Sequence, residues 1–268
     1  MVAHIHIGGI TIQTFGIFFA LNFIAWGFVA ARRLKELGKP VDWAYEIVVA
    51  AVIGGLIGAR VYYLIQNHGS LHGSLLGNVF GGSGLVWYGG FLGGTIAVLL
   101  WAYWRDYLNL KLVDIAAVGL PLGYGIGRIG CQVAGDGDYG KVSSLPWAMG
   151  YPDGTTPTPP GVTVQPTPIY ETVSMGLVAL VLWNWRDRFR PGVLFAMYLV
   201  LAGIERFIVE FWRRNDHVLG GLTAAQLESL GIFVAGTIAL LLTLQRHGTL
   251  RREEPVAPRV PSREPAPV

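Results

Sequence analysis

The chain has 268 residues, of which 52% are hydrophobic and 14% are charged, and its formal net charge is +3. With a mean hydropathy of +0.47, it is too apolar for a soluble globule of this length. Residues 61–104 contain no Asp, Glu, Lys or Arg, which is long enough for more than one segment at membrane depth. We therefore expect an all-α, polytopic membrane protein, and we do not expect nucleic-acid binding.

Apolar runs of roughly 20 residues predict about seven transmembrane helices. Their ranges are 11–31, 44–66, 85–104, 112–131, 168–186, 192–212 and 222–245. Together they make residues 1–246 one transmembrane domain. Within it, residues 132–167 are rich in Gly, Pro, Asp and Thr and predict an irregular cap outside the membrane. Residues 247–268 are rich in Pro and charge, which predicts a disordered tail.

Orientation follows from the charges between the predicted spans. If the N-terminus lies outside, the outer connections carry only Lys141, Arg213 and Arg214, and the other Lys and Arg of the connections fall on the inner side. Positive residues gather on the cytoplasmic side of membrane proteins. We therefore expect an external N-terminus and a cytoplasmic C-terminus.

Glycines that repeat every four residues predict close contacts between helices. Gly54 and Gly58 form one such pair, and Gly119, Gly123 and Gly127 form a longer series. Small residues at this spacing let helix backbones approach closely in a membrane.

Three arginines, Arg60, Arg128 and Arg206, fall inside the predicted spans. At about 1.5 Å of rise per residue, each lies roughly 21–24 Å above the inner end of its span, in a core of about 30 Å. A charge at such depth is costly and usually serves a ligand, a pore or a partner. For Arg128 and Arg206 we favour a clamp for a phospholipid phosphate that opens towards the outer leaflet, because guanidinium groups suit bidentate phosphate binding.

Structural roles are the alternative for these residues. Arg60 can extend outwards to the membrane surface, and each arginine can pair with an acid predicted near the same side. Those acids are Glu171, Glu205 and Glu210. Asp136 and Asp138 could bind a metal, but Asp-Gly-Asp in a loop is explained equally well by a turn. We expect no metal and no other cofactor.

The stretch GRIGCQVAGDGDYG at 127–140 resembles the signature of bacterial phosphatidylglycerol–prolipoprotein diacylglyceryl transferases, which runs Gly-Arg-x-Gly-Asn-x-x-Asn-x-Glu. Five further stretches follow the family's order. They are GGLIGARVYYLIQN at 54–67, WYGGFLGG at 87–94, QPTPIYE at 165–171, ERFIVEFWRR at 205–214 and GGLTAAQ at 220–226. The resemblance covers essentially the whole membrane part.

The resemblance implies a seven-helix enzyme of the bacterial inner membrane with a periplasmic active site and N-terminus. Such enzymes move the diacylglyceryl group of phosphatidylglycerol onto the lipobox cysteine thiol of a preprolipoprotein and release glycerol phosphate. Phosphatidylglycerol, the lipobox peptide and membrane lipid are the implied partners. The catalytic residues expected here are Arg128, Arg206, Asp136 and Tyr88. The residues expected to bind substrate are Arg60, Gly89, Gly90, Gln132, Tyr170, Glu171 and Glu210.

Several motif positions depart from the family pattern. Tyr88 stands where the family has the histidine of His-Gly-Gly, and Cys131 and Ala134 stand at its two asparagines. Further departures are Asp136 at the glutamate, Phe15 and Ala202 at tyrosines and Gln165 at a histidine. The phosphate-binding end thus matches better than the thiol-handling end. The alternatives are a relative that uses phosphatidylglycerol with another acceptor, such as a small molecule or water, a non-catalytic phospholipid-binding membrane protein, and a bundle whose arginines are only structural.

Overall fold

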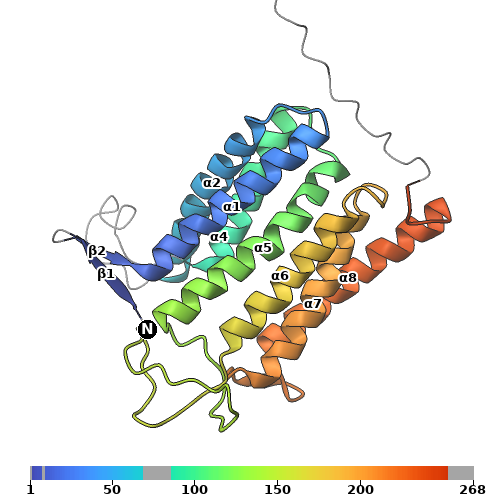
Figure 1. The fold of residues 1–268 in the computed structure, drawn as a ribbon. Helices are drawn as coiled ribbons and strands as arrows, with labels where there is room; N and C mark the ends of the chain where they lie inside the picture. Colours follow the sequence, from blue (N-terminus) through green and yellow to red (C-terminus); the bar gives the residue numbers. More distant parts are fainter. Residues whose placement is uncertain (1, 8–9, 69–85, 253–268) are drawn as a thin grey trace, which may run out of the picture.

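The computed structural model of the chain describes residues 2–7, 10–68 and 86–252, and in these ranges the fold is almost entirely helical (Figure 1). The α-helices are α1 (Thr14–Glu36), α2 (Trp43–Gln66), α4 (Trp87–Trp104), α5 (Leu110–Ala134), α6 (Thr167–Trp185), α7 (Val193–Val209) and α8 (Ala224–His247). A 3-10 turn, η1 (Glu210–Trp212), follows α7. Two short antiparallel hairpins complete the fold, β1 (His4–Ile7) with β2 (Ile10–Gln13) and β3 (His217–Leu219) with β4 (Leu222–Thr223).

The helices do not pack strictly in chain order, because α1 lies between α2 and α5. The most extensive contacts join α2 to α4, α1 to α5, α5 to α6 and α7 to α8. Figure 1 shows α1, α5 and α6 side by side, with the 135–166 loop gathered at one end of the bundle. The N-terminal hairpin and the β3–β4 hairpin lie towards that same end. The ends of α5, α6 and α7 therefore meet beneath one irregular cap.

Local sequence signals fix both ends of α5 and the start of α8. The Asn109 side chain accepts a hydrogen bond from the backbone N–H of Lys111, as a helix N-cap does. Gly135 ends α5 with φ of 59°, a conformation that glycine adopts without strain. Thr223 and Gln226 form a capping box at the first turn of α8, each side chain accepting a backbone N–H of the other residue.

The seven predicted helices match the seven described ones, with ends that differ by a few residues. The predicted end of the sixth, at residue 212, is a 3-10 turn rather than α-helix. The N-terminal hairpin was not predicted. Residues 248–252 lie against the end of α6, where Arg252 N donates to Arg188 O and Arg190 N donates to Leu250 O. The rest of the predicted tail lies outside the described residues.

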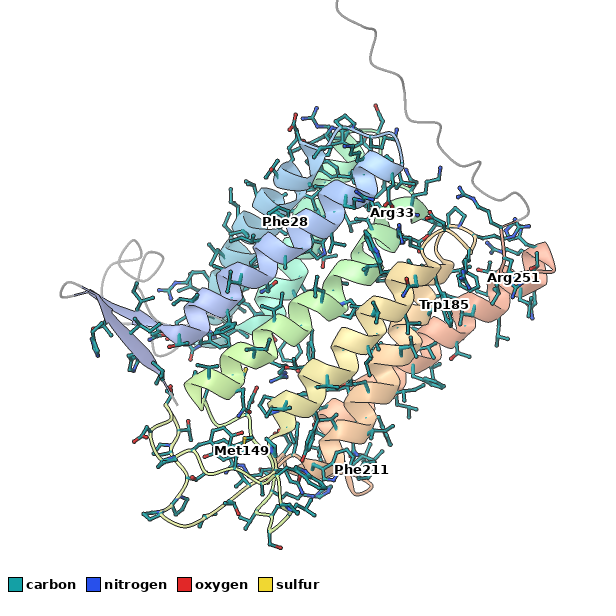
Figure 2. The ribbon with its side chains drawn as sticks, in the orientation of Figure 1. Phe28, Arg33, Met149, Trp185, Phe211 and Arg251 are labelled. Atoms are coloured by element: carbon teal, nitrogen blue, oxygen red, sulfur yellow. The ribbon has the colours of Figure 1, made fainter. Side chains whose placement is uncertain are left out.

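The outer surface of the bundle is apolar. In the described part of the chain, four helices, α1, α2, α5 and α8, are long and apolar enough to cross a membrane. Large apolar side chains point outwards along them, including Phe28 at 72% exposure (Figure 2) and Ile57 at 59%. Such a continuous apolar exterior is unfavourable in water and suits a lipid surrounding. The described fold is therefore that of an all-helical membrane protein.

The predicted glycine contact of α2 is confirmed, and its partner is α4. A Cβ atom at Gly58 would collide with the carbonyl oxygen of Gly89, and one at Gly54 would lie 2.6 Å from that of Gly93. Gly89 therefore has a packing role of its own. Backbone meets backbone along this pair of helices, so neither side can make room by rotating a side chain.

The glycine series of α5 is confirmed in part. A Cβ atom at Gly119 would collide with the Trp26 ring, and one at Gly123 would lie 3.1 Å from Asn22 Oδ1. Gly127 has open space at its Cβ position. The first two glycines thus hold α5 against α1.

We predict that Gly58→Ala lowers the free energy of unfolding by about 1–3 kcal/mol, as overpacking does. The matched control is Gly231→Ala in α8, where a Cβ atom meets nothing within 4 Å. The control should keep or slightly raise the thermal midpoint, because alanine favours helix over glycine by about 0.5–1 kcal/mol. The measurement is thermal unfolding in detergent, and equal midpoints for both variants would contradict the close α2–α4 contact.

Candidate active site

The charged side chains under the cap come from the ends of three neighbouring helices. Arg128 lies near the C-terminal end of α5, Glu171 in the first turns of α6 and Arg206 in the last turn of α7. Pro168 occupies a first-turn position of α6, where its missing N–H costs nothing. Helix dipoles favour an acid near a helix N-terminus and a base near a C-terminus. The local sequence thus places opposite charges at one level of the bundle.

Glu171 is the centre of the cluster, and it is completely buried. Its Oε1 accepts hydrogen bonds from Arg206 Nη1 at 3.1 Å and from the Tyr124 hydroxyl at 2.6 Å. Its Oε2 lies 3.1 Å from Arg128 Nε and accepts from Arg213 Nη1 at 3.3 Å. One carboxylate therefore ties three guanidinium groups together.

Asp138 of the cap closes the outer side of the cluster. One of its oxygens contacts Arg128 Nη1, and the other accepts a hydrogen bond from Arg213 Nη2 at 2.7 Å. Burial alone would raise the pKa of Asp138, but the guanidinium groups of Arg128 and Arg213 hold that pKa below its ordinary value. Asp138 is therefore an anion held between two arginines.

Glu210 links the cluster to the start of α8. Its Oε2 lies 3.0 Å from Arg206 Nη2, and its Oε1 accepts from the Thr223 hydroxyl at 2.9 Å and from Asn215 Nδ2 at 2.6 Å. Thr223 is also the N-cap of α8. The ion pairs of α7 and the first turn of α8 therefore hold one another in place.

We call this cluster the arginine network, and it contains equal numbers of positive and negative side chains. Its cations are Arg128, Arg206 and Arg213, and its anions are Asp138, Glu171 and Glu210. The alternative of pairing between arginines and neighbouring acids is thus realised for Arg128 and Arg206. The third acid predicted near them, Glu205, accepts instead from the Ser174 hydroxyl at 2.9 Å. The network also stays accessible at its edge, since the side chains of Arg206 and Asp138 are 24% and 36% exposed.

The remaining predicted site residues lie in contacts of their own. Arg60 of α2 holds its guanidinium 5.2 Å from the centre of the Tyr63 ring. Tyr88, at the start of α4, donates a hydrogen bond of 2.8 Å to Glu228 of α8. A Cβ atom at Gly90 would lie 3.5 Å from Ala59 Cβ of α2, which is an ordinary contact distance.

Gln132, Tyr170 and Asp136 belong to the cap and its base. Gln132 Oε1 accepts from the Tyr151 hydroxyl at 2.8 Å, and the Tyr170 hydroxyl donates to Gln165 Oε1 at 2.6 Å. Asp136 accepts a hydrogen bond from the backbone N–H of Asp138, and burial raises the pKa of Asp136. The structure thus joins Arg128, Arg206, Glu171 and Glu210 directly and arranges these three around them.

Sequence analysis missed three members of the site. Asp138 was considered only as a metal ligand or turn residue, and Arg213 and Tyr124 were not considered for the site. Arg213 was assigned to an outer connection, although its spacing of seven from Arg206 and three from Glu210 is that of one helical face. Tyr124 lies four residues before Arg128, and its ring is 4.9 Å from the guanidinium. Helical spacing around each known arginine was the available signal for both.

A possible metal-ligand group lies beside the network. Ligand atoms of Cys131, Asp136 and Asp138 fall within 4.8 Å of one another. Both oxygens of Asp138 already face arginines, however, and the three residues are no more than an acidic turn next to a buried thiol. The geometry assigns Asp138 to the arginine network.

We predict that Glu171→Gln lowers the free energy of unfolding by about 3–5 kcal/mol, because it leaves buried guanidinium groups without their central counter-ion. Asp153→Asn is the control, since it makes the same acid-to-amide change at an exposed position of the cap. Thermal midpoints in detergent report the difference. A midpoint of Glu171→Gln as high as that of the control would show that the network does not hold α5, α6 and α7 together.

Comparison with known proteins identifies the family. The family model described as prolipoprotein diacylglyceryl transferase matches residues 2–242. A phosphatidylglycerol–prolipoprotein diacylglyceryl transferase of Finegoldia magna is 33% identical over 235 residues, which are 86% of this chain and 90% of the relative. The transferases of that name from Clostridioides difficile and Geobacter sulfurreducens are each 31% identical, over 86% and 90% of this chain and over 90% and 95% of the relatives. These matches confirm the family resemblance, and the chain belongs to the prolipoprotein diacylglyceryl transferase family.

Proposed function

We propose that this protein transfers the diacylglyceryl group of phosphatidylglycerol to the lipobox cysteine thiol of a prolipoprotein and releases glycerol phosphate. Its relatives carry that activity in their names. The observation that carries the proposal is the convergence of Arg128, Arg206 and Arg213 on one buried carboxylate under the cap. In this reading residues 1–246 are the catalytic domain and 132–167 cover its site.

Guanidinium groups supply what this reaction needs. The thiol gives its proton to a base, and its sulfur attacks the carbon of the diacylglyceryl unit that is bonded to a phosphate oxygen. A C–S bond forms, that C–O bond breaks, and glycerol phosphate leaves with the negative charge on its phosphate. Fixed donors aimed at that charge lower the barrier most where water is excluded. Arg128 and Arg213 already hold the anion of Asp138 between them, so a phosphate competes for the same donors. Arg206 offers the third guanidinium from the opposite side of Glu171.

The proposed function also includes an orientation in the membrane. We place the seven helices across the bacterial inner membrane, with the N-terminus periplasmic and the C-terminus cytoplasmic. The positive residues of the connections support this orientation, because it puts Lys39, Arg105, Lys111 and Arg190 inside. The arginine network then lies in the outer half of the bilayer, at a depth that phospholipid phosphates reach.

The thiol end of the site departs most from the family motifs. A phenol has an unperturbed pKa near 10 and is a poor base at neutral pH. Tyr88 donates to Glu228, so Glu228 is the group of this pair that can accept a proton, and Tyr88 positions it. Because Tyr88, Cys131 and Ala134 replace motif residues, the second candidate function is transfer from phosphatidylglycerol to another acceptor.

One assay separates these functions. Purified protein is incubated with phosphatidylglycerol and a lipobox peptide, and the thioether product and glycerol phosphate are both followed. Both products support the proposed transfer. Glycerol phosphate without thioether supports another acceptor. If neither product forms but the protein still retains the lipid, the result supports a binding protein.

We predict that Arg206→Lys lowers kcat about 10²–10³-fold, the usual cost of losing one donor to a developing oxyanion. Lysine keeps the charge but loses the planar fork that bridges Glu171 and Glu210. Arg214→Lys is the control, because Arg214 is exposed and contacts the Gly137 carbonyl and the Tyr139 ring instead. Unchanged turnover in a folded Arg206→Lys variant would remove Arg206 from the mechanism.

A further inference from the structure

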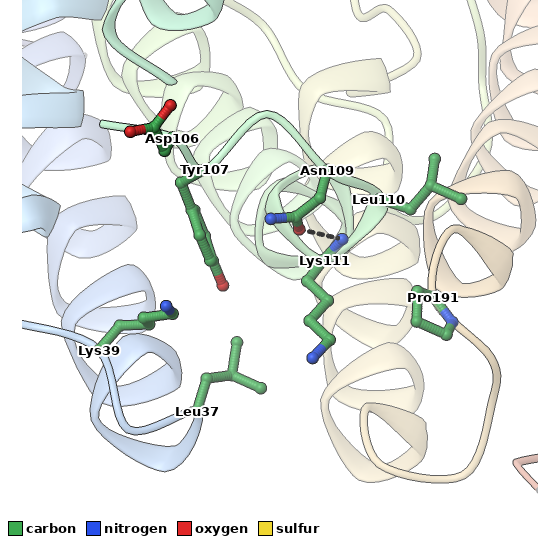
Figure 3. A pocket seen from close by; sticks show the side chains of 8 residues that line it. All are labelled: Leu37, Lys39, Asp106, Tyr107, Asn109, Leu110, Lys111 and Pro191. Atoms are coloured by element: carbon green, nitrogen blue, oxygen red, sulfur yellow. Dashed lines mark hydrogen bonds between the residues drawn. The ribbon is translucent and has the colours of Figure 1, made fainter. Parts of the chain in front are cut away.

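A polar cavity lies at the end of the bundle opposite the arginine network. It has a volume of about 630 Å³ and is bounded by the α1–α2 connection, the α4–α5 connection with the start of α5, and the α6–α7 connection (Figure 3). Its lining residues are Leu37, Lys39, Asp106, Tyr107, Asn109, Leu110, Lys111 and Pro191. None of these residues has a part in the proposed transfer reaction.

The side chains that line the cavity carry a net positive charge. Lys39 and Lys111 supply two ammonium groups against one carboxylate, that of Asp106. Lys39 Nζ is held 5.7 Å from the centre of the Trp43 ring and 5.1 Å from that of Tyr107. The first turn of α5 also begins here and brings the positive end of its dipole. Helix N-termini of this kind bind phosphate and other anions.

The Tyr107 hydroxyl is an independent observation that points to a ligand site. Tyr107 is only 3% exposed, yet its hydroxyl has no hydrogen-bond partner among the described residues. Buried polar groups in folded proteins are almost always paired. Figure 3 shows the hydroxyl pointing into the space between Lys39 and Lys111. Burial raises the pKa of Tyr107, so at neutral pH the group is a phenol with a proton to donate.

The surroundings of the cavity are those of a membrane boundary. Leu37, Leu110 and Pro191 form its apolar wall, and Tyr103 and Trp104, in the last turn of α4, are 68% and 75% exposed. Exposed aromatic side chains at helix ends mark the level of lipid head groups. Basic pockets between helices at this level bind the head groups of anionic lipids.

We propose that this cavity binds the phosphate group of an anionic phospholipid of the adjacent leaflet. Lys39 and Lys111 neutralise the phosphate, the Tyr107 hydroxyl donates to one of its oxygens, and the positive end of the α5 dipole faces it. The acyl chains follow the exposed apolar side chains beside Leu110. In the orientation proposed above this is a cytoplasmic-leaflet lipid, separate from the donor substrate.

Native mass spectrometry of the full chain with short-chain phosphatidic acid tests this site. The arginine network can take the same lipid, so the readout is the number of lipids retained by each variant. We expect Lys39→Gln/Lys111→Gln to retain one lipid fewer than the unmodified chain. Tyr107→Phe should bind the same number with a few-fold weaker affinity, the scale of one hydrogen bond. The control, Lys141→Gln at the opposite end of the bundle, should retain the full number.

Two further arms identify the source of the phosphate. Short-chain diacylglycerol, which lacks phosphate, should not occupy the site. If inorganic phosphate displaces the lipid from the unmodified chain at equal concentration, the site is still a phosphate site but its ligand is the free ion. An equal lipid number for the double lysine variant and the unmodified chain would overturn the proposal. So would equal binding of diacylglycerol.

Discussion

A buried carboxylate that must be surrounded by cations determines the arrangement of the capped end of this protein. Glu171 is fully buried and receives hydrogen bonds or ion pairs from α5, α7 and the segment after η1. An uncompensated charge in such a place would cost several kcal/mol or more, so the three helix ends cannot separate without exposing it. The same requirement fixes the cap, because Asp138 supplies the counter-charge that Arg128 and Arg213 still need. The same contacts therefore hold the helix ends together and form the candidate site.

Much of the fold could be predicted from the sequence, because the hydrocarbon core of a membrane restricts the length and composition of the helices that cross it. Span length, charge-free runs and four-residue glycine spacing predicted seven transmembrane helices and a close contact of α2. The described residues form seven α-helices, and the contact of α2 is confirmed. Helix ends were less accurate, since caps such as Asn109 and the Thr223–Gln226 box depend on a few local hydrogen bonds. The N-terminal hairpin was missed because its short alternating strands continue directly into an apolar helix.

Most members of the site could be predicted from helical positions and motifs, but the member in the cap could not. Arg128, Arg206, Glu171 and Glu210 follow from span depth and motif position, and the structure brings them into direct contact. Tyr124 and Arg213 keep helical spacing to Arg128 and Arg206, so their signal was present but overlooked. Asp138 lies in the cap, where spacing along the chain does not determine proximity, and its position depends on how the 135–166 loop folds back, through pairings such as that of Gly140 N with Gln165 O. No periodic pattern in the sequence encodes those contacts.

The carboxylate of Asp138 is tethered to the cap and already bonded to two of the guanidinium groups. A tethered group acts at a high effective concentration, so any incoming anion must outcompete a rival that never diffuses away. A small ion such as free phosphate has no further interaction that offsets this competition, whereas a lipid also gains binding free energy by burying its acyl chains. Under the proposed function, this pairing would keep soluble anions off the guanidinium groups and would re-form once the water-soluble product departs.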